Sequence, residues 1–272
     1  MIAPSKNIQA IVQISQAVMC EGQYADKAFE SYFRENKPLS NADTGFIVQE
    51  VYSLIRNWRL ISEIQARNGL GTTENIEILI AIGQVLFNKN PTEFKTINQI
   101  KRVDIHKAYA EIKGNRAILH SIPDWLDKMG NTELAERWPT IIQALNQEAQ
   151  LVIRTNTIKC NRDKLQKSLQ NQGLKTSIHD KAIDALIFSN KLNVFKLPEF
   201  KQGLFEMQDV SSQLVGHFAN PQPGMRVIDG CAGNGGKTLH LASLMQNKGR
   251  IIALDLFPGK LGHCRPAALL IR

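Results

Sequence analysis

The sequence predicts an α/β protein built from three parts. A helical N-terminal domain covers residues 1–147, a small β-α-β-β module covers 148–204, and the incomplete first βαβ unit of a parallel α/β domain covers 205–272. Three observations lead to this division. Apolar residues recur at helical spacing in the first half, short strand-like runs replace them near residue 150, and a glycine-rich loop joins two apolar strands after residue 225.

The composition is that of an ordinary folded protein with a basic charge balance. Hydrophobic residues make up 43% of the chain and charged residues 21%, and the formal net charge is +8. A basic balance favours polyanionic partners. No apolar run reaches the roughly 18 residues of a membrane span, and the first ten residues lack the pattern of an export signal. We therefore expect a cytoplasmic protein with no membrane contact, and a monomer.

The cysteines predict neither a metal site nor a disulfide framework. The four of them are scattered along the chain and form no CxxC pair, so we expect reduced thiols and no bound metal. They are Cys20, Cys160, Cys231 and Cys264.

The first 147 residues predict helices with no catalytic grouping. Ser40 followed by Asp43 is typical of a helix start, and apolar residues continue at helical spacing from Ile47 to Ile61. Two further helices are expected over Asn75–Asn88 and Glu133–Asn146. Isolated histidines and tryptophans in this region are interpreted as packing or surface residues, since such residues are seldom functional alone. They are His106, His120, Trp125 and Trp138.

A small basic module follows. Strands are expected at Leu151–Arg154, Thr176–His179 and Ala185–Phe188, with a helix capped by Asn161 that ends at Gly173. Residues 151–203 contain ten Lys/Arg and four Asp/Glu, so this module carries most of the net positive charge. Such a patch suits a phosphate backbone, and a solvated lysine-rich surface is the alternative.

The most informative stretch is a glycine loop between two strands. Met225–Asp229 is a buried-strand pattern, a helix begins near Thr238, and a second strand over Arg250–Leu254 is closed by Asp255. Strand, glycine loop, helix, strand and acid form the first βαβ unit of a Rossmann-like, nucleotide-binding sheet. Glycines allow close approach to a ligand, the helix N-terminus offers free N–H groups, and the acid can accept hydrogen bonds from ribose hydroxyls.

Two common nucleotide fingerprints fail by single positions. A phosphate-binding P-loop would need glycine where Cys231 stands, five residues before Gly236. A dinucleotide fingerprint starting from Gly233 and Gly235 would need glycine where Thr238 stands. An adenosine cofactor without a polyphosphate remains, and S-adenosylmethionine fits.

These residues carry a family resemblance. The segment DGCAGNGGKTLHLA, with Asp255 downstream and QDVSSQ upstream, resembles the Sun-type (Fmu/RsmB-like) RNA cytosine-5 methyltransferases. The stretches SIPDWL and ALNQEAQLVIRTNTIK resemble the RNA-binding module of that family, so the likeness covers roughly residues 120–261. Asn234 departs from the family's usual proline.

The resemblance implies a cofactor site and a substrate class. S-adenosylmethionine would be held by one continuous loop, with Asp255 on its ribose hydroxyls and RNA, expected to be ribosomal, on the 151–203 module. Cys231 would belong to the cofactor loop and would not act as a nucleophile. The loop residues are Cys231, Ala232, Gly233, Asn234, Gly235, Gly236 and Lys237.

The same resemblance leaves the catalytic residues unassigned. The family's two catalytic cysteines, of which one adds to the cytosine ring, lie in Pro-Cys and Thr-Cys motifs beyond the second strand. No such motif occurs before Arg272, so we name no catalytic residue. The likeness is lost after Leu261, and Pro266 would break the helix expected there, which suggests a frameshift and a truncated domain.

Residues 221–272 should be poorly stable alone and should expose apolar surface where further strands would pair. The alternative function is a non-catalytic RNA-binding protein with a vestigial cofactor loop, and cofactor binding separates the two functions.

Overall fold

The computed structural model describes residues 6–36, 39–71, 75–87 and 102–262. The chain divides into two compact units, Met1–Gln147 and Glu148–Arg272. The further division predicted at residues 204/205 stays a prediction. The expectations about Pro266 and the frameshift, which concern residues 262–272, fall almost wholly outside the described residues. Within the described residues, no helix combines the length and apolar character that a membrane span requires.

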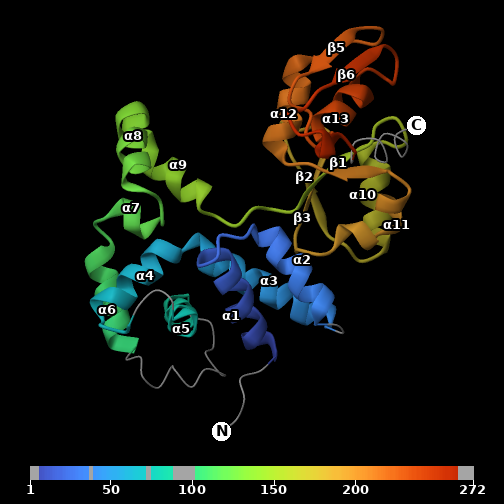
Figure 1. The fold of residues 1–272 in the computed structure, drawn as a ribbon. Coiled ribbons are helices and arrows are strands. Elements are labelled where there is room, and N and C mark those ends of the chain that lie inside the picture. Colours follow the sequence, from blue (N-terminus) through green and yellow to red (C-terminus); the bar gives the residue numbers. More distant parts are fainter. Residues whose placement is uncertain (1–5, 37–38, 72–74, 88–101, 263–272) are drawn as a thin grey trace. The chain divides into compact units, whose positions relative to one another are not determined.

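The regular elements of the first unit, over the part of it that the structure describes, are helices (Figure 1). Its core is one cluster of mostly aliphatic side chains from seven of the described helices, with Ile47, Ile64, Leu79 and Ile82 fully shielded from solvent. The helices are α1 (Lys6–Met19), α2 (Ala25–Glu35), α3 (Asn41–Arg56), α4 (Trp58–Arg67), α5 (Ile76–Leu86), α6 (Arg102–Ile112), α7 (Arg116–Leu119), α8 (Asp124–Leu134) and α9 (Trp138–Leu145), with a 3-10 turn at Ala135–Arg137.

The helix start predicted at Ser40 is confirmed, and two predicted helices are interrupted. The Ser40 hydroxyl accepts a hydrogen bond from the Asp43 N–H (3.0 Å) at the start of α3. The helical pattern over Ile47–Ile61 breaks at Asn57, whose side-chain amide donates to the Ser53 carbonyl (2.8 Å) and closes α3. The single helix expected over Glu133–Asn146 is wrong, because Ala135 takes a positive φ of 44° and ends α8.

A network of side-chain hydrogen bonds joins α7, α8 and α9, the last three helices of this unit. The Arg116 guanidinium donates to the Asp127 carboxylate (2.6 Å), and the Trp138 indole N–H donates to the same carboxylate (2.7 Å). The hydrogen bond from Arg116 is the main reason why the pKa of Asp127 lies below its ordinary value. Trp138, which the sequence analysis interpreted as a packing or surface residue, is buried and fixes this network.

We expect Asp127→Asn to destabilise the protein by about 1 kcal/mol at pH 7, because it removes the charge from three hydrogen bonds, two from Arg116 and one from Trp138. The folded pKa of Asp127 is lowered, so its stabilising contribution is present above the unfolded value of 3.8 and is lost as the pH falls through the folded one. Urea unfolding at pH 7 and pH 3 measures this. An equal deficit of the variant at both pH values would contradict the assignment.

The second unit contains two sheets (Figure 1). The first has four antiparallel strands in the order β2-β3-β1-β4, and the second pairs β5 with β6 in parallel. The elements are β1 (Val152–Thr155), α10 (Arg162–Asn171), β2 (Thr176–Ile178), β3 (Ala185–Phe188), a 3-10 turn at Val194–Lys196, α11 (Pro198–Lys201), β4 (Phe205–Met207), α12 (Val210–Ala219), β5 (Arg226–Asp229), α13 (Gly236–Leu244) and β6 (Arg250–Ala253).

Helices cover both faces of the four-stranded sheet. One face packs Ile153 and Phe205 against Leu165 and Leu169 of α10. The opposite face carries a second cluster in which Val152, Ala182 and Ala185 meet Val210 and Leu214 of α12. The strand β4 was missed by the sequence analysis, because three residues are too few to show a periodic pattern.

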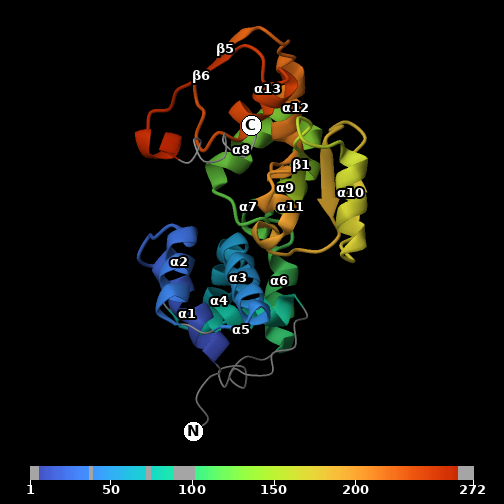
Figure 2. The same ribbon diagram turned by 90° about the vertical axis from the view of Figure 1, so that its right-hand side faces the viewer.

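The parallel pair β5-β6 leaves one face open, as expected. Ile228 lies opposite Ile252 in the register, and both point to the side away from the Val227 and Ile251 side chains. Ile228 is 67% exposed and Leu254 is 51% exposed. Figure 2 shows the two strands side by side with α13 following β5. The expected low stability of residues 221–272 alone stays a prediction.

Candidate functional site

The glycine loop lies at the carboxyl end of β5 and leads directly into α13. Gly233 has a φ of 55° and Gly235 a φ of 90°, a backbone conformation that favours glycine. The Gly235 N–H donates to the Ala232 carbonyl (2.9 Å), which tightens the turn before the helix begins at Gly236. The sequence-predicted loop is therefore a sharp turn that ends at a helix N-terminus.

Asp255 is brought to this loop by the parallel pairing of β5 with β6. One oxygen of its carboxylate accepts from the Gly233 N–H (2.8 Å), and the other accepts from the Phe257 N–H (2.9 Å). These backbone hydrogen bonds, from Phe257 first and Gly233 second, hold the pKa of Asp255 below its ordinary value. The charged carboxylate of Asp255 therefore contacts a loop glycine that precedes it by 22 residues in the sequence.

A hydrogen bond between two side chains, which was not predicted from the sequence, anchors the loop to the strand before it. The Thr238 hydroxyl donates to the Asp229 carboxylate (2.7 Å), which ties the first turn of α13 to the end of β5. Thr238 is buried, whereas Asp229 is half-buried. Two features of the sequence could have indicated this hydrogen bond: the threonine that follows Gly-Gly-Lys, and the acid that precedes the loop.

The loop side chains separate into buried and exposed positions. Ala232 and Gly235 are buried, and Gly233 is half-buried. Cys231, Asn234, Gly236 and Lys237 are exposed, and the thiol of Cys231 is free. A small residue inside the turn and polar groups on its outer side suit a loop that wraps a ligand with its backbone.

Two glutamines of the QDVSSQ segment connect the four-stranded sheet to the loop helix. The Arg154 guanidinium donates to the side-chain oxygen Oε1 of Gln208 (2.6 Å), and the side-chain amide of Gln208 donates to the backbone carbonyl of Gly236 (3.2 Å). The Gln213 amide in turn donates to the backbone carbonyl of Gln208 (2.9 Å). The segment is thus a bridge between β1 and the start of α13.

The basic module exposes its positive charges to solvent, except for one arginine that the sequence-based count included. Arg154, counted among its ten basic residues, is 1% exposed and faces the protein interior. Burial lowers the pKa of Arg154 to about 10, and the charges of Glu206 and Asp184 oppose that shift. The other nine basic side chains keep at least partial exposure, whereas Asp184 and Glu199 are buried, so the surface is more basic than the sequence count implies.

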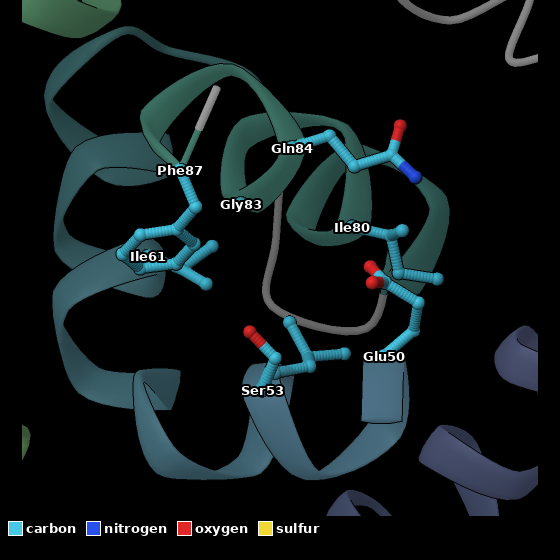
Figure 3. Close-up of a pocket in the computed structure, with 8 residues that line it drawn as sticks. Glu50, Ser53, Ile61, Ile80, Gly83, Gln84 and Phe87 are labelled. Atoms are coloured by element: carbon cyan, nitrogen blue, oxygen red, sulfur yellow. The ribbon is translucent and has the colours of Figure 1, made fainter. Parts of the chain in front are cut away.

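The helical unit contains a small pocket that is unrelated to this loop (Figure 3). Glu50 and Ser53 of α3 face Ile80 and Gln84 of α5 across it, with Phe87 at one end. Its volume is about 10 Å³, which is the space of a single water molecule. A nucleotide does not fit there.

Comparison with known families agrees with the geometry in two segments. Residues 122–195 match the family model of the Methyltr_RsmF/B-like, ferredoxin-like domain. Residues 217–263 match the family model of the 16S rRNA methyltransferase RsmB/F. The second segment contains both the glycine loop and Asp255.

Proteins with similar sequences carry the name of the same methyltransferase family. The ribosomal RNA small subunit methyltransferase B of Vibrio vulnificus is 33% identical over 133 residues, 49% of this chain and 31% of that protein. Its counterpart from Escherichia coli O6:K15:H31 is 27% identical over 254 residues, 83% of this chain and 58% of that protein. The matched part of the chain therefore covers between 31% and 58% of the length of these relatives.

Two crystal structures share the fold. The structure of PH0851 has a TM-score of 0.72 at 19% identity, over 100% of this chain and 68% of that one. A methyltransferase homolog protein from Pyrococcus horikoshii has a TM-score of 0.51 at 28% identity, over 55% of this chain and 49% of that one. The resemblance to the RsmB/F-like, Sun-type methyltransferases is confirmed.

Proposed function

Because two segments of this chain match RsmB/F-like methyltransferase families, we propose that it provides the cofactor-binding and RNA-binding parts of an RNA cytosine-5 methyltransferase. Ribosomal RNA of the small subunit is the proposed substrate, in keeping with the names of its relatives, and the cytoplasm is the proposed place of action. The observation that carries the proposal is the contact between the Asp255 carboxylate and the Gly233 N–H of the loop.

The proposed cofactor is S-adenosylmethionine, which supplies the methyl group when bound. Asp255 would accept hydrogen bonds from the ribose hydroxyls, for which its low pKa keeps it ionised at neutral pH. Residues Cys231 to Lys237 would wrap the methionine and ribose end with their backbone, and the N-terminus of α13 would offer its free N–H groups. No residue of the loop is proposed to act as a nucleophile.

The proposed RNA contact is the basic surface of residues 151–203. Lys164 and Lys167 lie one turn apart on α10 and are both exposed. Lysines in this arrangement neutralise successive phosphates without reading sequence. The bridge from Arg154 through Gln208 to Gly236 would then hold the RNA-binding sheet and the cofactor loop in a fixed geometry.

Calorimetry with S-adenosylmethionine tests the proposal. The chain should bind one equivalent, and it should bind neither ATP nor NAD, since both fingerprints fail in the loop. RNA binding without any cofactor binding would overturn the proposal and favour the alternative of a non-catalytic RNA-binding protein. Binding of ATP in place of S-adenosylmethionine would also overturn it.

We expect the double change Lys164→Gln and Lys167→Gln to weaken RNA binding and to reduce the slope of log affinity against log salt by about 1.4, since each phosphate contact contributes about 0.7 with single-stranded RNA. Filter binding of a ribosomal RNA fragment at several salt concentrations measures the slope. Lys107→Gln, an exposed lysine of the helical unit, is the matched control and should leave the slope unchanged. Equal slopes for all three proteins would exclude α10 from the RNA contact.

A further inference from the structure

Three potential metal ligands meet inside the second unit, away from the glycine loop. They are the carboxylate of Asp184, just before β3, and the imidazoles of His217 on α12 and His240 on α13. The Asp184 oxygen lies 3.3 Å from His217 Nε2 and 4.0 Å from His240 Nε2, and all three ligand atoms lie within 4.8 Å of one another. Ligands at roughly 2.0–2.1 Å from a tetrahedral zinc ion stand about 3.3 Å apart, so small side-chain shifts complete the geometry.

His240 is buried without a hydrogen-bond partner. Its side chain is 1% exposed, and neither ring nitrogen has a partner within the described residues. A buried polar atom of this kind is costly unless something binds it. Its Nε2 is the atom nearest Asp184, whereas its Nδ1 faces Gly216, where an added Cβ would lie only 2.3 Å away. The ring is therefore wedged between α12 and α13 with Nε2 aimed at the cluster.

The charges around the cluster are mixed. Burial, together with the charges of Arg154 and His217, lowers the pKa of His240 to about 3. Burial raises the pKa of Asp184, while His217, Arg154 and Arg162 oppose that shift. Arg154 repels a cation, but Glu206 and Asp184 supply two carboxylates against it.

We propose that Asp184, His217 and His240 form a binding site for one divalent transition-metal ion of the zinc class. Two imidazoles and one carboxylate are a donor set that such ions accept, with an open fourth position. Asp184 and His217 also line a surface hollow of about 530 Å³, together with Thr157, Ile183 and Ser243. Water can reach the ion from this hollow.

A bound ion would fasten three elements that are distant in sequence. It would join the segment before β3 to α12 and α13, and α13 begins at the cofactor loop. This conclusion departs from the expectation of no metal, which rested on the absence of CxxC pairs. The three ligands are too widely separated along the chain to form a recognisable spacing motif.

The test is zinc titration of the whole chain after treatment with EDTA. We expect one zinc ion per chain, a higher melting temperature with zinc, and a Co²⁺ spectrum of tetrahedral type without thiolate charge-transfer bands, which excludes the cysteines as ligands. Asp184→Asn and His217→Gln, which line the hollow and are less disruptive than a change at buried His240, should each lower zinc affinity by at least about 100-fold.

His106→Gln, an exposed histidine of the helical unit, is the control and should retain full affinity. The proposal is overturned if the wild-type chain takes up no zinc, or if Asp184→Asn and His217→Gln bind zinc as tightly as the control. Calorimetry with S-adenosylmethionine is read separately. A failure of the metal site therefore leaves the proposed methyltransferase function standing.

Discussion

Replacing Asp255 with alanine is expected to lower the affinity for S-adenosylmethionine by about 100-fold. The cofactor would lose both ribose hydrogen bonds, each to a charged acceptor, and the Gly233 N–H of the loop would lose its acceptor. Asp255→Asn keeps one acceptor oxygen and should fall between the alanine variant and the wild type. Calorimetry at pH 7 measures the three affinities.

Two comparisons make this result specific. Asp180→Ala removes an acid that is 80% exposed in the basic module, and it should bind the cofactor as the wild type does. The melting temperature of Asp255→Ala should remain close to that of the wild type, because the carboxylate is not deeply buried. Unchanged cofactor affinity in Asp255→Ala would remove the ribose role from this residue.

Replacing Gly249 with alanine is expected to destabilise the second unit by about 3 kcal/mol, since it adds backbone strain to a severe clash. Gly249 has a φ of 116°, and an added Cβ would lie 2.4 Å from the backbone carbonyl oxygen of Met225 and 2.5 Å from the Met245 side chain. The carbonyl cannot move aside, because it accepts the hydrogen bond from the Arg250 N–H that begins the β5-β6 pairing. Urea unfolding followed by circular dichroism measures the loss.

Gly173→Ala is the matched control for this change. Gly173 also has a positive φ, 78°, but an added Cβ there would meet nothing within 4 Å. It should cost only the backbone strain of about 1 kcal/mol. If Gly249→Ala and Gly173→Ala are equally stable, the close approach of the β5 and β6 ends is not what requires glycine at 249.

The elements that the sequence predicted well are those with a strong local signal. Ser40 and Asn161 each accept the hydrogen bond expected of the predicted helix cap. The strand Ala185–Phe188 has the predicted bounds. Caps and apolar runs act over a few residues, so the chain needs no tertiary contact to display them.

The sequence was wrong where distant contacts decide the local structure. The helix expected over Glu133–Asn146 is split at Ala135, where Trp138 turns toward Asp127 of the preceding helix. Arg154 was counted as a surface charge, but its place on the α12 side of the sheet buries it beside Gln208. Neither residue type nor spacing carries that information.

The sequence by itself determined the glycine loop, the helix that follows it and the acid after the second strand, because all three lie within one short βαβ unit. Only the tertiary structure decided that Asp255 contacts Gly233, that Gln208 reaches Gly236, and that Asp184 meets two histidines. The physical reason is that each of these contacts depends on strand pairing or helix packing, which local propensity does not specify. Local propensity fixes which elements form, and the burial of their apolar faces fixes which side chains they bring together.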